Sequence, residues 1–305
     1  SEPLGVTCVI APWNYPVQLL LLPMVAAIAA GNAVVGKPSE LAPNTATELV
    51  SLIEALNEPA VTVVQGGVAE TTELLAQRFD HILYTGNSRV ARIVMRAAAE
   101  HLTPVTLELG GKSPAIVSRH ANIEVAARRI AWGKFVNAGQ TCIAPDYVLI
   151  NESVRAPFID EVQKAVTEFY GTDPHASADY GRIVSQRHYE RLAGMLGSGK
   201  VAVGGDAIAD DRYISPTVLV DVDMDSKMMD EEIFGPLLPV IPVSSVNEAV
   251  SFVNARPHPL ALYVFSENKN VVDMVLDQTT SGGVTVNGQA SVPWPMAPRS
   301  DAERY

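Results

Sequence analysis

The run GVTCVI at residues 5–10 and the run AVVG at residues 33–36 are short and rich in β-branched residues, and an apolar-periodic stretch at 18–30 separates them. The first third of the chain continues this alternation, with strand patterns at 61–64, 81–84 and 105–108 and helix patterns at 44–56, 70–78 and 88–101. The repeated order of strand, helix and strand indicates right-handed crossover connections, and these build a parallel sheet covered by helices on both faces. The sequence therefore predicts an α/β fold with a doubly wound, Rossmann-like sheet.

A second α/β domain is predicted after residue 112, where the alternation becomes less regular. Its helix patterns lie at 123–136, 154–170, 186–196 and 246–255, and its strand patterns lie at 147–150, 200–203, 217–220, 238–243 and 261–265. We predict a dinucleotide-binding domain over residues 1–112, a candidate catalytic domain over 113–287 and a proline-rich tail over 288–305.

The charge and composition favour a small-molecule partner. A net charge of -12 argues against general affinity for nucleic acid or anionic membranes. The hydrophobic share of 48% and the charged share of 18% are typical of a globular protein. The most apolar stretch, at 17–30, is too short to span a bilayer, so no membrane segment is expected.

Only two cysteines are present, Cys8 and Cys142, so the sequence contains no disulfide framework. This favours a reducing compartment, and we expect the cytoplasm. The six histidines show no metal-ligand spacing, and no metal site is predicted. The chain begins with Ser1 and not with Met, so we expect it to start inside a longer polypeptide.

The segment NAGQTC at residues 137–142 places a thiol after a glycine-containing turn. Cys142 in such a position suits a nucleophile, although a cysteine is also often a small buried hydrophobe. Cys8 lies inside a β-branched strand pattern and is predicted to be buried. Upstream, LELGGK at 107–112 ends a strand with Glu108. A glutamate at the carboxyl end of a buried sheet can have a raised pKa and act as a base; the alternative is a solvated or ion-paired glutamate.

Two further strand ends carry polar side chains. Asn14 lies in PWNYP at 12–16, where its amide is suited to bind a developing oxyanion; the alternative is a turn whose aromatic residues fill the core. Lys37 and Glu40 lie in GKPSE at 36–40, at the strand end that approaches an adenine ribose in dinucleotide-binding folds. The alternative is a surface loop in which Ser39 or Asn44 caps the next helix.

The standard Gly-x-Gly-x-x-Gly phosphate motif is missing after the first strand. YTGNS at 84–88 opens a helix instead, where backbone N–H groups can receive a phosphate; an ordinary helix cap is the alternative. In EEIFGP at 231–236, Glu232 is suited to bond a ribose hydroxyl and Phe234 to lie against a flat ring. The alternative is a turn with Phe234 in the core.

Taken in order, the segments 12–16, 36–40, 84–87, 107–112, 139–142 and 232–236 resemble the aldehyde dehydrogenase superfamily. The phrases LTPVTLELGGKSP at 102–114, QTCIAPDY at 140–147 and PLALYVFS at 259–266 resemble its class 3 branch, which includes fatty and aromatic aldehyde dehydrogenases. The resemblance extends from Glu2 to about Asn287, and it implies the aldehyde dehydrogenase fold and a dinucleotide cofactor bound without the standard motif.

The resemblance implies NAD(P)-dependent oxidation of an aldehyde to a carboxylic acid. Cys142 would attack the carbonyl carbon, and its own backbone N–H and the Asn14 amide would hold the oxyanion. After hydride loss, Glu108 would activate the water that hydrolyses the thioester. Lys37 and Glu40 would bind the adenosine ribose, and the Glu40 charge would favour NAD over NADP, which stays possible. The remaining cofactor-binding positions would be Trp13, Gly66, Tyr84, Gly86, Asn87, Leu109, Glu232 and Phe234.

The family usually forms homodimers, but the sequence departs from it at both ends. The family's N-terminal segment is not found before Ser1, and the family's glycine-rich segment is replaced after Asn287 by GQASVPWPMAPR at 288–299. Since these parts carry dimerisation elements, we expect an incomplete dimer interface. One alternative to an active dehydrogenase is a catalytically impaired fragment or a non-catalytic binding or structural protein on the same fold. Another is a relative that transfers its acyl group to coenzyme A. Glu108 argues against the latter, because a base is needed only where water is the acceptor.

Overall fold

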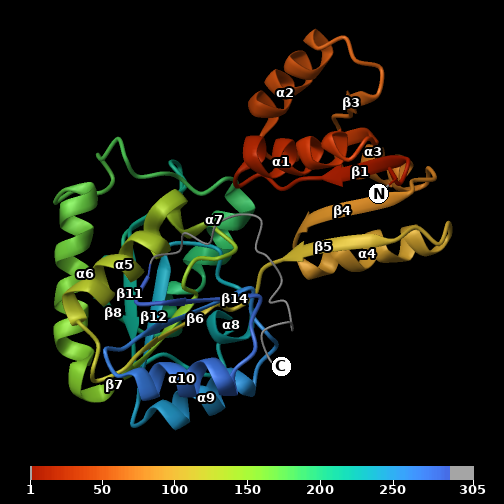
Figure 1. The fold of residues 1–305 in the computed structure, drawn as a ribbon. Coiled ribbons are helices and arrows are strands. Elements are labelled where there is room, and N and C mark those ends of the chain that lie inside the picture. The colour runs from red at the N-terminus through yellow and green to blue at the C-terminus, as the bar shows by residue number, and fades with distance from the viewer. Residues whose placement is uncertain (1, 289–305) are drawn as a thin grey trace. The chain divides into compact units, whose positions relative to one another are not determined.

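The computed structural model describes residues 2–288 (Figure 1). Contacts between residues divide the chain into two compact units, Ser1–Leu109 and Gly110–Tyr305. The division falls just before the boundary expected after Lys112. The proline-rich tail predicted over 288–305 lies, from residue 289 onward, outside the described residues.

The first unit contains a five-stranded sheet in the order β3-β2-β1-β4-β5. All of its neighbouring strands are parallel. This confirms the predicted doubly wound sheet, and the strand order reverses between β1 and β4, which is where such folds place ligands. The strands are β1 (Val6–Ile10), β2 (Ala33–Lys37), β3 (Val61–Val63), β4 (His81–Gly86) and β5 (Val105–Leu109).

Four helices cover both faces of this sheet because side chains alternate along its strands. Cys8 and Ile10 of β1 pack into a cluster with α3 and α4, whereas Val9 packs into a second cluster with α1 and α2. The prediction that Ser39 or Asn44 caps a helix is wrong, since α2 begins after Ala42 with no side-chain cap. The helices are α1 (Pro16–Ala29), α2 (Pro43–Ala55), α3 (Val68–Leu75) and α4 (Ser88–Ala99).

The second unit contains a seven-stranded sheet in the order β14-β13-β6-β7-β12-β11-β8. Its strands are parallel except for β8, which runs antiparallel to β11. They are β6 (Pro114–Val117), β7 (Tyr147–Asn151), β8 (Lys200–Val203), β11 (Thr217–Val220), β12 (Leu237–Val243), β13 (Ala261–Phe265) and β14 (Gly283–Val286). A separate antiparallel pair consists of β9 (Ala207–Ile208) and β10 (Tyr213–Ile214).

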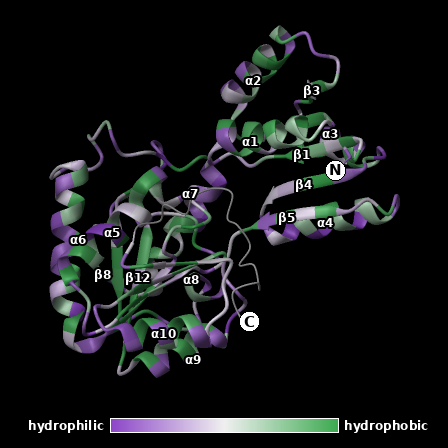
Figure 2. Cartoon of the chain, viewed as in Figure 1, coloured by the Kyte–Doolittle hydropathy of each residue, from purple (hydrophilic) through white to green (hydrophobic). Residues whose placement is uncertain are grey.

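The helices of the second unit also form two layers. Helices α5 and α6 pack with one set of strand side chains, such as Ala115 and Val117, and α9 and α10 pack with the alternate set, such as Ile116. Figure 2 shows the resulting pattern, with hydrophobic strands and helices that carry polar residues on one side. The helices are α5 (Ile123–Phe135), α6 (Arg155–Tyr170), α7 (Gln186–Ala193), α8 (Lys227–Asp230), α9 (Val246–Asn254) and α10 (Lys269–Gln278), with short 3-10 turns η1 (Val136–Gly139), η2 (Glu152–Val154) and η3 (Leu196–Ser198).

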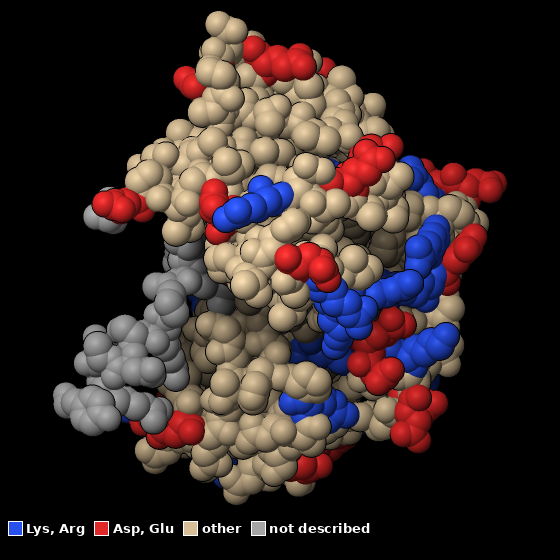
Figure 3. All heavy atoms as spheres, turned by 90° about the vertical axis from the view of Figure 1, so that its right-hand side faces the viewer, with Lys and Arg blue, Asp and Glu red and all other residues tan. Residues whose placement is uncertain are grey.

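The surface of the described residues carries both signs of charge. On the face in Figure 3, Lys and Arg side chains are interspersed with Asp and Glu side chains. Across residues 2–288, the longest apolar helices fall short of what a bilayer crossing requires.

Candidate active site

Cys142 follows a turn with unusual backbone conformation. The φ angles of Asn137, Ala138 and Gly139 are 53°, 51° and 74°, so three successive residues are left-handed. This region is unfavourable for residues with a Cβ atom, and such strain persists only where surrounding contacts hold it. Cys142 is partly exposed, whereas Cys8 is fully buried and its thiol pKa is raised to about 12 by burial. The two thiols therefore differ in both access and backbone strain, and Cys8 is buried as predicted.

The side chain of Gln140 holds this turn from inside. Its Nε2 donates to the carbonyl oxygens of Asn137 at 3.0 Å and Arg182 at 3.1 Å, and its Oε1 accepts from the Val184 N–H at 2.9 Å. Gln140 is 3% exposed, so these bonds are shielded from water. The turn is thereby fixed to the segment 182–184.

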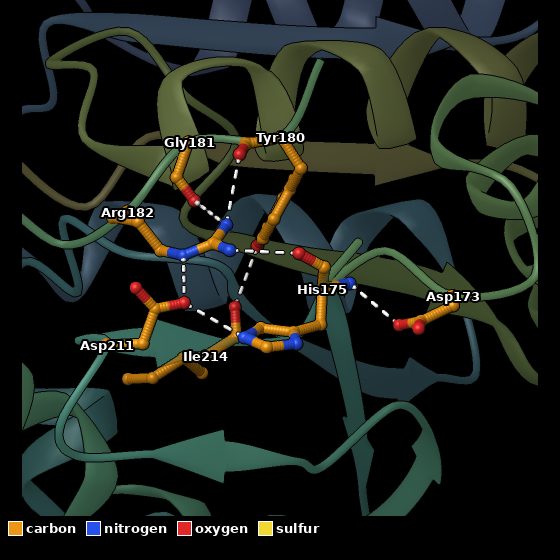
Figure 4. A network of polar contacts seen from close by, with 7 residues as sticks. All are labelled: Asp173, His175, Tyr180, Gly181, Arg182, Asp211 and Ile214. Atoms are coloured by element: carbon orange, nitrogen blue, oxygen red, sulfur yellow. Dashed lines mark hydrogen bonds and ion pairs between the residues drawn. The ribbon is translucent and has the colours of Figure 1, made fainter. Parts of the chain in front are cut away.

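A polar network fixes that segment in turn (Figure 4). The guanidinium of Arg182 donates to Asp211 at 2.7 Å and to the carbonyl oxygen of Tyr180 at 3.2 Å. The Tyr180 hydroxyl donates to the carbonyl oxygen of Ile214 at 2.9 Å. His175 contributes its carbonyl oxygen to Arg182 and its ring to Asp211, both at 2.9 Å. The network thus supports the thiol turn through the segment that Gln140 binds.

Gly139 brings the thiol turn against the segment that carries Glu232 and Phe234. A Cβ atom at Gly139 would lie 2.2 Å from the carbonyl oxygen of Gly235, so only glycine fits there. The segment is itself clamped at Ile233, whose N–H donates to Asp146 at 3.0 Å and whose carbonyl oxygen accepts from Arg191 at 2.6 Å. Two predicted site segments, 139–142 and 232–236, therefore lie together in the second unit.

The Glu232 carboxylate rests on the Gly110-Gly111 backbone. A Cβ atom at Gly110 would lie 2.3 Å from Glu232 Oε1, which explains why glycine occupies that position. Burial raises the Glu232 pKa to about 8 and the negative charge of Asp146 adds to this, while the Gly111 backbone, Lys112 and Lys134 oppose the shift. Phe234 is only partly buried and has a φ of 50°, so it does not fill the core as one alternative had it.

Four charged residues around this segment were not predicted from the sequence. Lys112 pairs with Asp146 at 2.5 Å and donates to the carbonyl oxygens of Met228 at 2.7 Å and Glu231 at 2.9 Å. Lys134 is completely buried. A signal for Lys134 was present, because it follows the buried Ala126 and Ile130 at steps of four along one helix. The sequence around Arg191 and Asp146 shows no comparable pattern that would have predicted their place near this segment.

In the first unit, Lys37 and Glu40 lie at the end of β2. Lys37 is 3% exposed, and its Nζ donates to the Pro38 carbonyl oxygen at 2.9 Å and pairs with Glu40 at 3.4 Å. Glu40 also lines a cavity of about 350 Å³ together with Gly66. The full lining consists of Pro38, Ser39, Glu40, Pro43, Ala46, Gln65, Gly66, Gly67 and Glu70. Glu40, predicted to bind the adenosine ribose, and Gly66, predicted to line the cofactor cleft, therefore line the same cavity.

Glycine is required at Gly66 of this cavity. Its φ is 147°, and a Cβ atom would lie 2.4 Å from the Glu70 side chain. The Glu70 carboxylate accepts from the Gly67 N–H at 2.7 Å, and backbone hydrogen bonds of Glu70 and Gly67 lower its pKa. The cavity thus carries two carboxylates, Glu40 and Glu70, at its wall.

The ends of β1 and β4 lie side by side at the point where the strand order reverses. Trp13 and Asn14 follow β1 and are partly buried, which does not fit the alternative that the aromatic residue fills the core. At the end of β4, the Tyr84 ring covers Gly86, where a Cβ atom would lie 2.2 Å from the Tyr84 hydroxyl. The Asn87 side chain accepts from the Val90 N–H at 3.0 Å, so the helix-cap interpretation is confirmed for Asn87.

Glu108 lies in β5 next to Leu109, and both are partly buried. Burial raises the pKa of the Glu108 carboxyl. Within residues 2–288 its carboxylate forms no ion pair, so the ion-paired alternative does not hold. A carboxyl group with a raised pKa and access to solvent is suited to take a proton from water. In the same residues, His, Cys, Asp and Glu side chains form no group of three or more that could hold a metal ion.

Known proteins resemble this chain along most of its length. The model of the aldehyde dehydrogenase family matches residues 1–299. The chain is 54% identical over 288 residues to the dog protein named aldehyde dehydrogenase, dimeric NADP-preferring, covering 94% of this chain and 64% of that protein. It is 55% identical over 287 residues to mouse aldehyde dehydrogenase family 3 member A2, covering 94% of this chain and 59% of that protein.

Solved structures give the same result. The substrate-bound state of Staphylococcus aureus AldH matches with a TM-score of 0.92 and 48% identity, covering 94% of this chain and 64% of that chain. The P. syringae indole-3-acetaldehyde dehydrogenase AldA, in complex with NAD+ and IAA, matches with a TM-score of 0.85 and 29% identity over 94% and 61% of the two chains. This chain spans about three fifths of the length of these relatives. The chain belongs to the aldehyde dehydrogenase family, and its similarity to family 3 members confirms the class 3 resemblance.

Proposed function

We propose that this chain catalyses the NAD(P)-dependent oxidation of an aldehyde to a carboxylic acid. The observation that carries the proposal is the strained, clamped turn that presents the partly exposed thiol of Cys142 beside the Glu232 segment. An inert cysteine needs no such turn, as the ordinary strand around Cys8 demonstrates. Family membership supports the reaction class.

In the proposed mechanism Cys142 reacts as a thiolate with the aldehyde carbonyl carbon, and a thiohemiacetal oxyanion forms. The Cys142 backbone N–H and the Asn14 amide donate hydrogen bonds to that oxyanion. When bound, the nicotinamide cofactor supplies the hydride acceptor that turns the thiohemiacetal into a thioester. Glu108 then removes a proton from water, the resulting hydroxide attacks the thioester carbon, and the carboxylic acid leaves as the Cys142 thiolate is restored.

The cavity at the ends of β2 and β3 fits the adenosine part of a dinucleotide. Its glycines permit close approach of a flat base and sugar, and the Glu40 carboxylate can accept hydrogen bonds from ribose hydroxyls. Glu40 and Glu70 would both repel a 2′-phosphate, which favours NAD. One relative is named NADP-preferring, so NADP is an expected second cofactor.

One relative is named dimeric, and this leads us to propose that the protein also forms a homodimer. We also propose a cytoplasmic location, because Cys8 and Cys142 are both free thiols, as is usual in a reducing compartment. Its substrate would be a small aldehyde of the fatty or aromatic kind, by analogy with class 3. Size-exclusion chromatography with light scattering measures the mass directly. A monomer at micromolar concentration would refute the dimer.

The activity is tested by incubating the purified protein with NAD and a series of aliphatic and aromatic aldehydes. NADH should form with the wild type, and with Cys8→Ala as a control that retains Cys142. It should not form with Cys142→Ala. If the wild type forms no NADH although NAD raises its melting temperature, the protein binds the cofactor without catalysis. That outcome would refute the proposal and favour the non-catalytic alternative.

A further inference from the structure

The ion pair between Lys112 and Asp146 lies inside the second unit. Its nitrogen and oxygen atoms are 2.5 Å apart, and the two side chains are 11% and 4% exposed. Every other ion pair between described residues has at least one side chain that is 47% exposed or more. Two charges lose much hydration on burial, so a buried pair adds little stability beyond what apolar side chains would give. This pair therefore calls for a role other than stability.

Lys112 uses all three donors of its ammonium. One reaches Asp146, and the other two reach the carbonyl oxygens of Met228 at 2.7 Å and Glu231 at 2.9 Å. Both carbonyl groups belong to the segment that leads into Glu232. Lys112 thus ties the start of the second unit to that segment.

Asp146 uses both oxygens of its carboxylate. Oδ2 accepts from Lys112, and Oδ1 accepts from the Ile233 N–H at 3.0 Å. The backbone N–H of Asp146 donates to the Ser113 carbonyl oxygen at 2.7 Å. Since Asp146 follows Cys142 in the same loop, the pair joins three segments of the second unit, which are residues 110–113, 142–146 and 228–233.

The pair holds the backbone on both sides of Glu232. The Glu231 carbonyl group belongs to the peptide plane before Glu232, and the Ile233 N–H belongs to the plane after it. Lys112 binds the first plane and Asp146 binds the second. Because peptide groups are planar, holding both planes fixes the φ and ψ angles of Glu232 and the direction in which its side chain leaves the backbone. The Glu232 carboxylate accordingly lies against Gly110.

We propose that Lys112 and Asp146 are positioning residues, whose ion pair fixes both peptide planes around Glu232 and so directs its carboxylate toward a ribose of the cofactor. The inference rests on the proposed function, because Glu232 has a ribose to bind only if the chain binds a nicotinamide cofactor.

The two charges of the pair act on Glu232 in opposite directions. Burial raises the Glu232 pKa to about 8, the negative charge of Asp146 adds to the rise, and the positive charge of Lys112 opposes it. Removing both charges together therefore disturbs the Glu232 titration less than removing either one. A variant that lacks both reports on the position of the Glu232 carboxylate more than on its charge.

The variant to test is Lys112→Met/Asp146→Leu. Lys112→Met alone would leave the Asp146 charge buried and unpaired, and the protein might not fold, whereas replacing a whole buried pair by apolar side chains is often neutral. Asp146→Asn keeps the size of the side chain and should show the same effects at smaller size. The matched control is Glu161→Leu/Lys164→Met, which removes the exposed pair on α6.

The first measurement needs no cofactor. Amide hydrogen exchange at Ile233 reports on the plane that Asp146 holds. In Lys112→Met/Asp146→Leu this amide should exchange at least about tenfold faster than in the wild type, while the control variant should match the wild type. Unchanged exchange at Ile233 overturns the inference.

The second measurement separates positioning from general damage. In Lys112→Met/Asp146→Leu the Kd for NAD, from calorimetry, should rise about tenfold through the misplaced carboxylate, and KM for the aldehyde should stay within about twofold. In a Glu232→Ala background the same double substitution should raise Kd by less than about twofold, because the carboxylate that the pair directs is gone. A full tenfold rise in that background contradicts the inference.

These measurements also separate the inference from the proposed function. If the wild type binds NAD and Lys112→Met/Asp146→Leu binds it equally well, the inference fails and the proposed function stands. If the wild type binds no NAD, the proposed function fails and the ribose role of the pair fails with it.

Discussion

Strand β1 around Cys8 and the turn around Cys142 place the same side chain in opposite settings. Cys8 lies in regular strand backbone between two helix layers, and ordinary burial accounts for all that is seen there. The Cys142 turn has three left-handed residues, a glycine in steric contact with Gly235 and an internal clamp by Gln140. Backbone strain that is maintained by so many contacts indicates function, whereas a regular buried strand indicates only packing.

The largest expected effect concerns the two thiols. Cys142→Ala should lower kcat at least about 10³-fold because no other group there can form the thioester. Its free energy of unfolding should change little, since Cys142 is partly exposed. Cys8→Ala should keep kcat but lower the free energy of unfolding by about 1 kcal/mol through a small cavity. NADH formation and urea denaturation measure the two quantities. Equal losses of kcat in Cys142→Ala and Cys8→Ala would refute the claim that only Cys142 acts in the reaction.

The buried charges near the Cys142 turn should cost stability in a pH-dependent way. Lys134 has a pKa of about 8 in the folded protein against an ordinary value of 10.5. Below pH 8 both states are protonated and the full cost is present, about 3 kcal/mol for a shift of this size. Between about pH 8 and pH 10.5 the unfolded state binds more protons than the folded state, so the free energy of unfolding rises with pH.

Lys134→Met should therefore be more stable than the wild type below pH 8, and the two should converge as the pH rises above 10. Glu232 should have the opposite effect on the free energy of unfolding. Because its pKa is raised in the folded protein, the folded state binds more protons than the unfolded state between pH 4.5 and about 8, and stability falls as the pH increases through this range. Urea denaturation at several pH values of the wild type, Lys134→Met and Glu232→Gln measures this. A pH-independent difference between Lys134→Met and wild type would contradict it.

Gly139→Ala tests the contact between the thiol turn and Gly235. The new Cβ would lie 2.2 Å from a carbonyl oxygen and would add strain at a φ of 74°. We expect a loss of about 2 kcal/mol or more in the free energy of unfolding, and a lower kcat. Gly171→Ala is the matched control, because Gly171 has a φ of 78° and no atom within 4 Å of the position that a Cβ would take. Similar losses in both variants would show that φ alone accounts for the effect.

The smallest expected effect comes from the network that supports the turn. Arg182→Lys keeps the charge but loses the fork that joins Asp211 and three carbonyl oxygens, and through Gln140 it should loosen the turn. We expect kcat to fall about threefold, which corresponds to less than about 1 kcal/mol. Arg128→Lys, at an exposed pair with Glu168, should leave kcat unchanged. If both variants behave alike, the network does not position Cys142.

The regular parts of the fold were predictable from local pattern. The strands at 200–203, 217–220 and 261–265 were predicted at their observed bounds because β-branched runs end at clear turn signals. Strands β6, β9, β10 and β14 and helices α8 and α10 were missed. β6 is four residues long and begins with Pro114, and α10 follows β13 after a short loop. For α10 the Asn268 cap was a readable signal.

Local pattern was enough to propose site residues but could not predict the conformation around them. Cys142, Glu108 and Glu232 were proposed from their places after a turn, at the end of a strand and before a strand. The left-handed conformation of Asn137 and Ala138 depends on contacts with residues 182–184 and 235, which no local pattern contains. The same holds for the perturbed pKa of Lys134, which comes from burial by distant segments.

The clamp on the thiol turn also has a consequence for biosynthesis. Ribosomes make the chain from its N-terminus, so Cys142 is synthesised before Val184 and Gly235, the residues that hold its turn in place. Until those residues emerge, the left-handed conformation has nothing to maintain it, and the nascent thiol sits in relaxed chain. The left-handed conformation of the thiol turn can therefore form only after residue 235 has been synthesised.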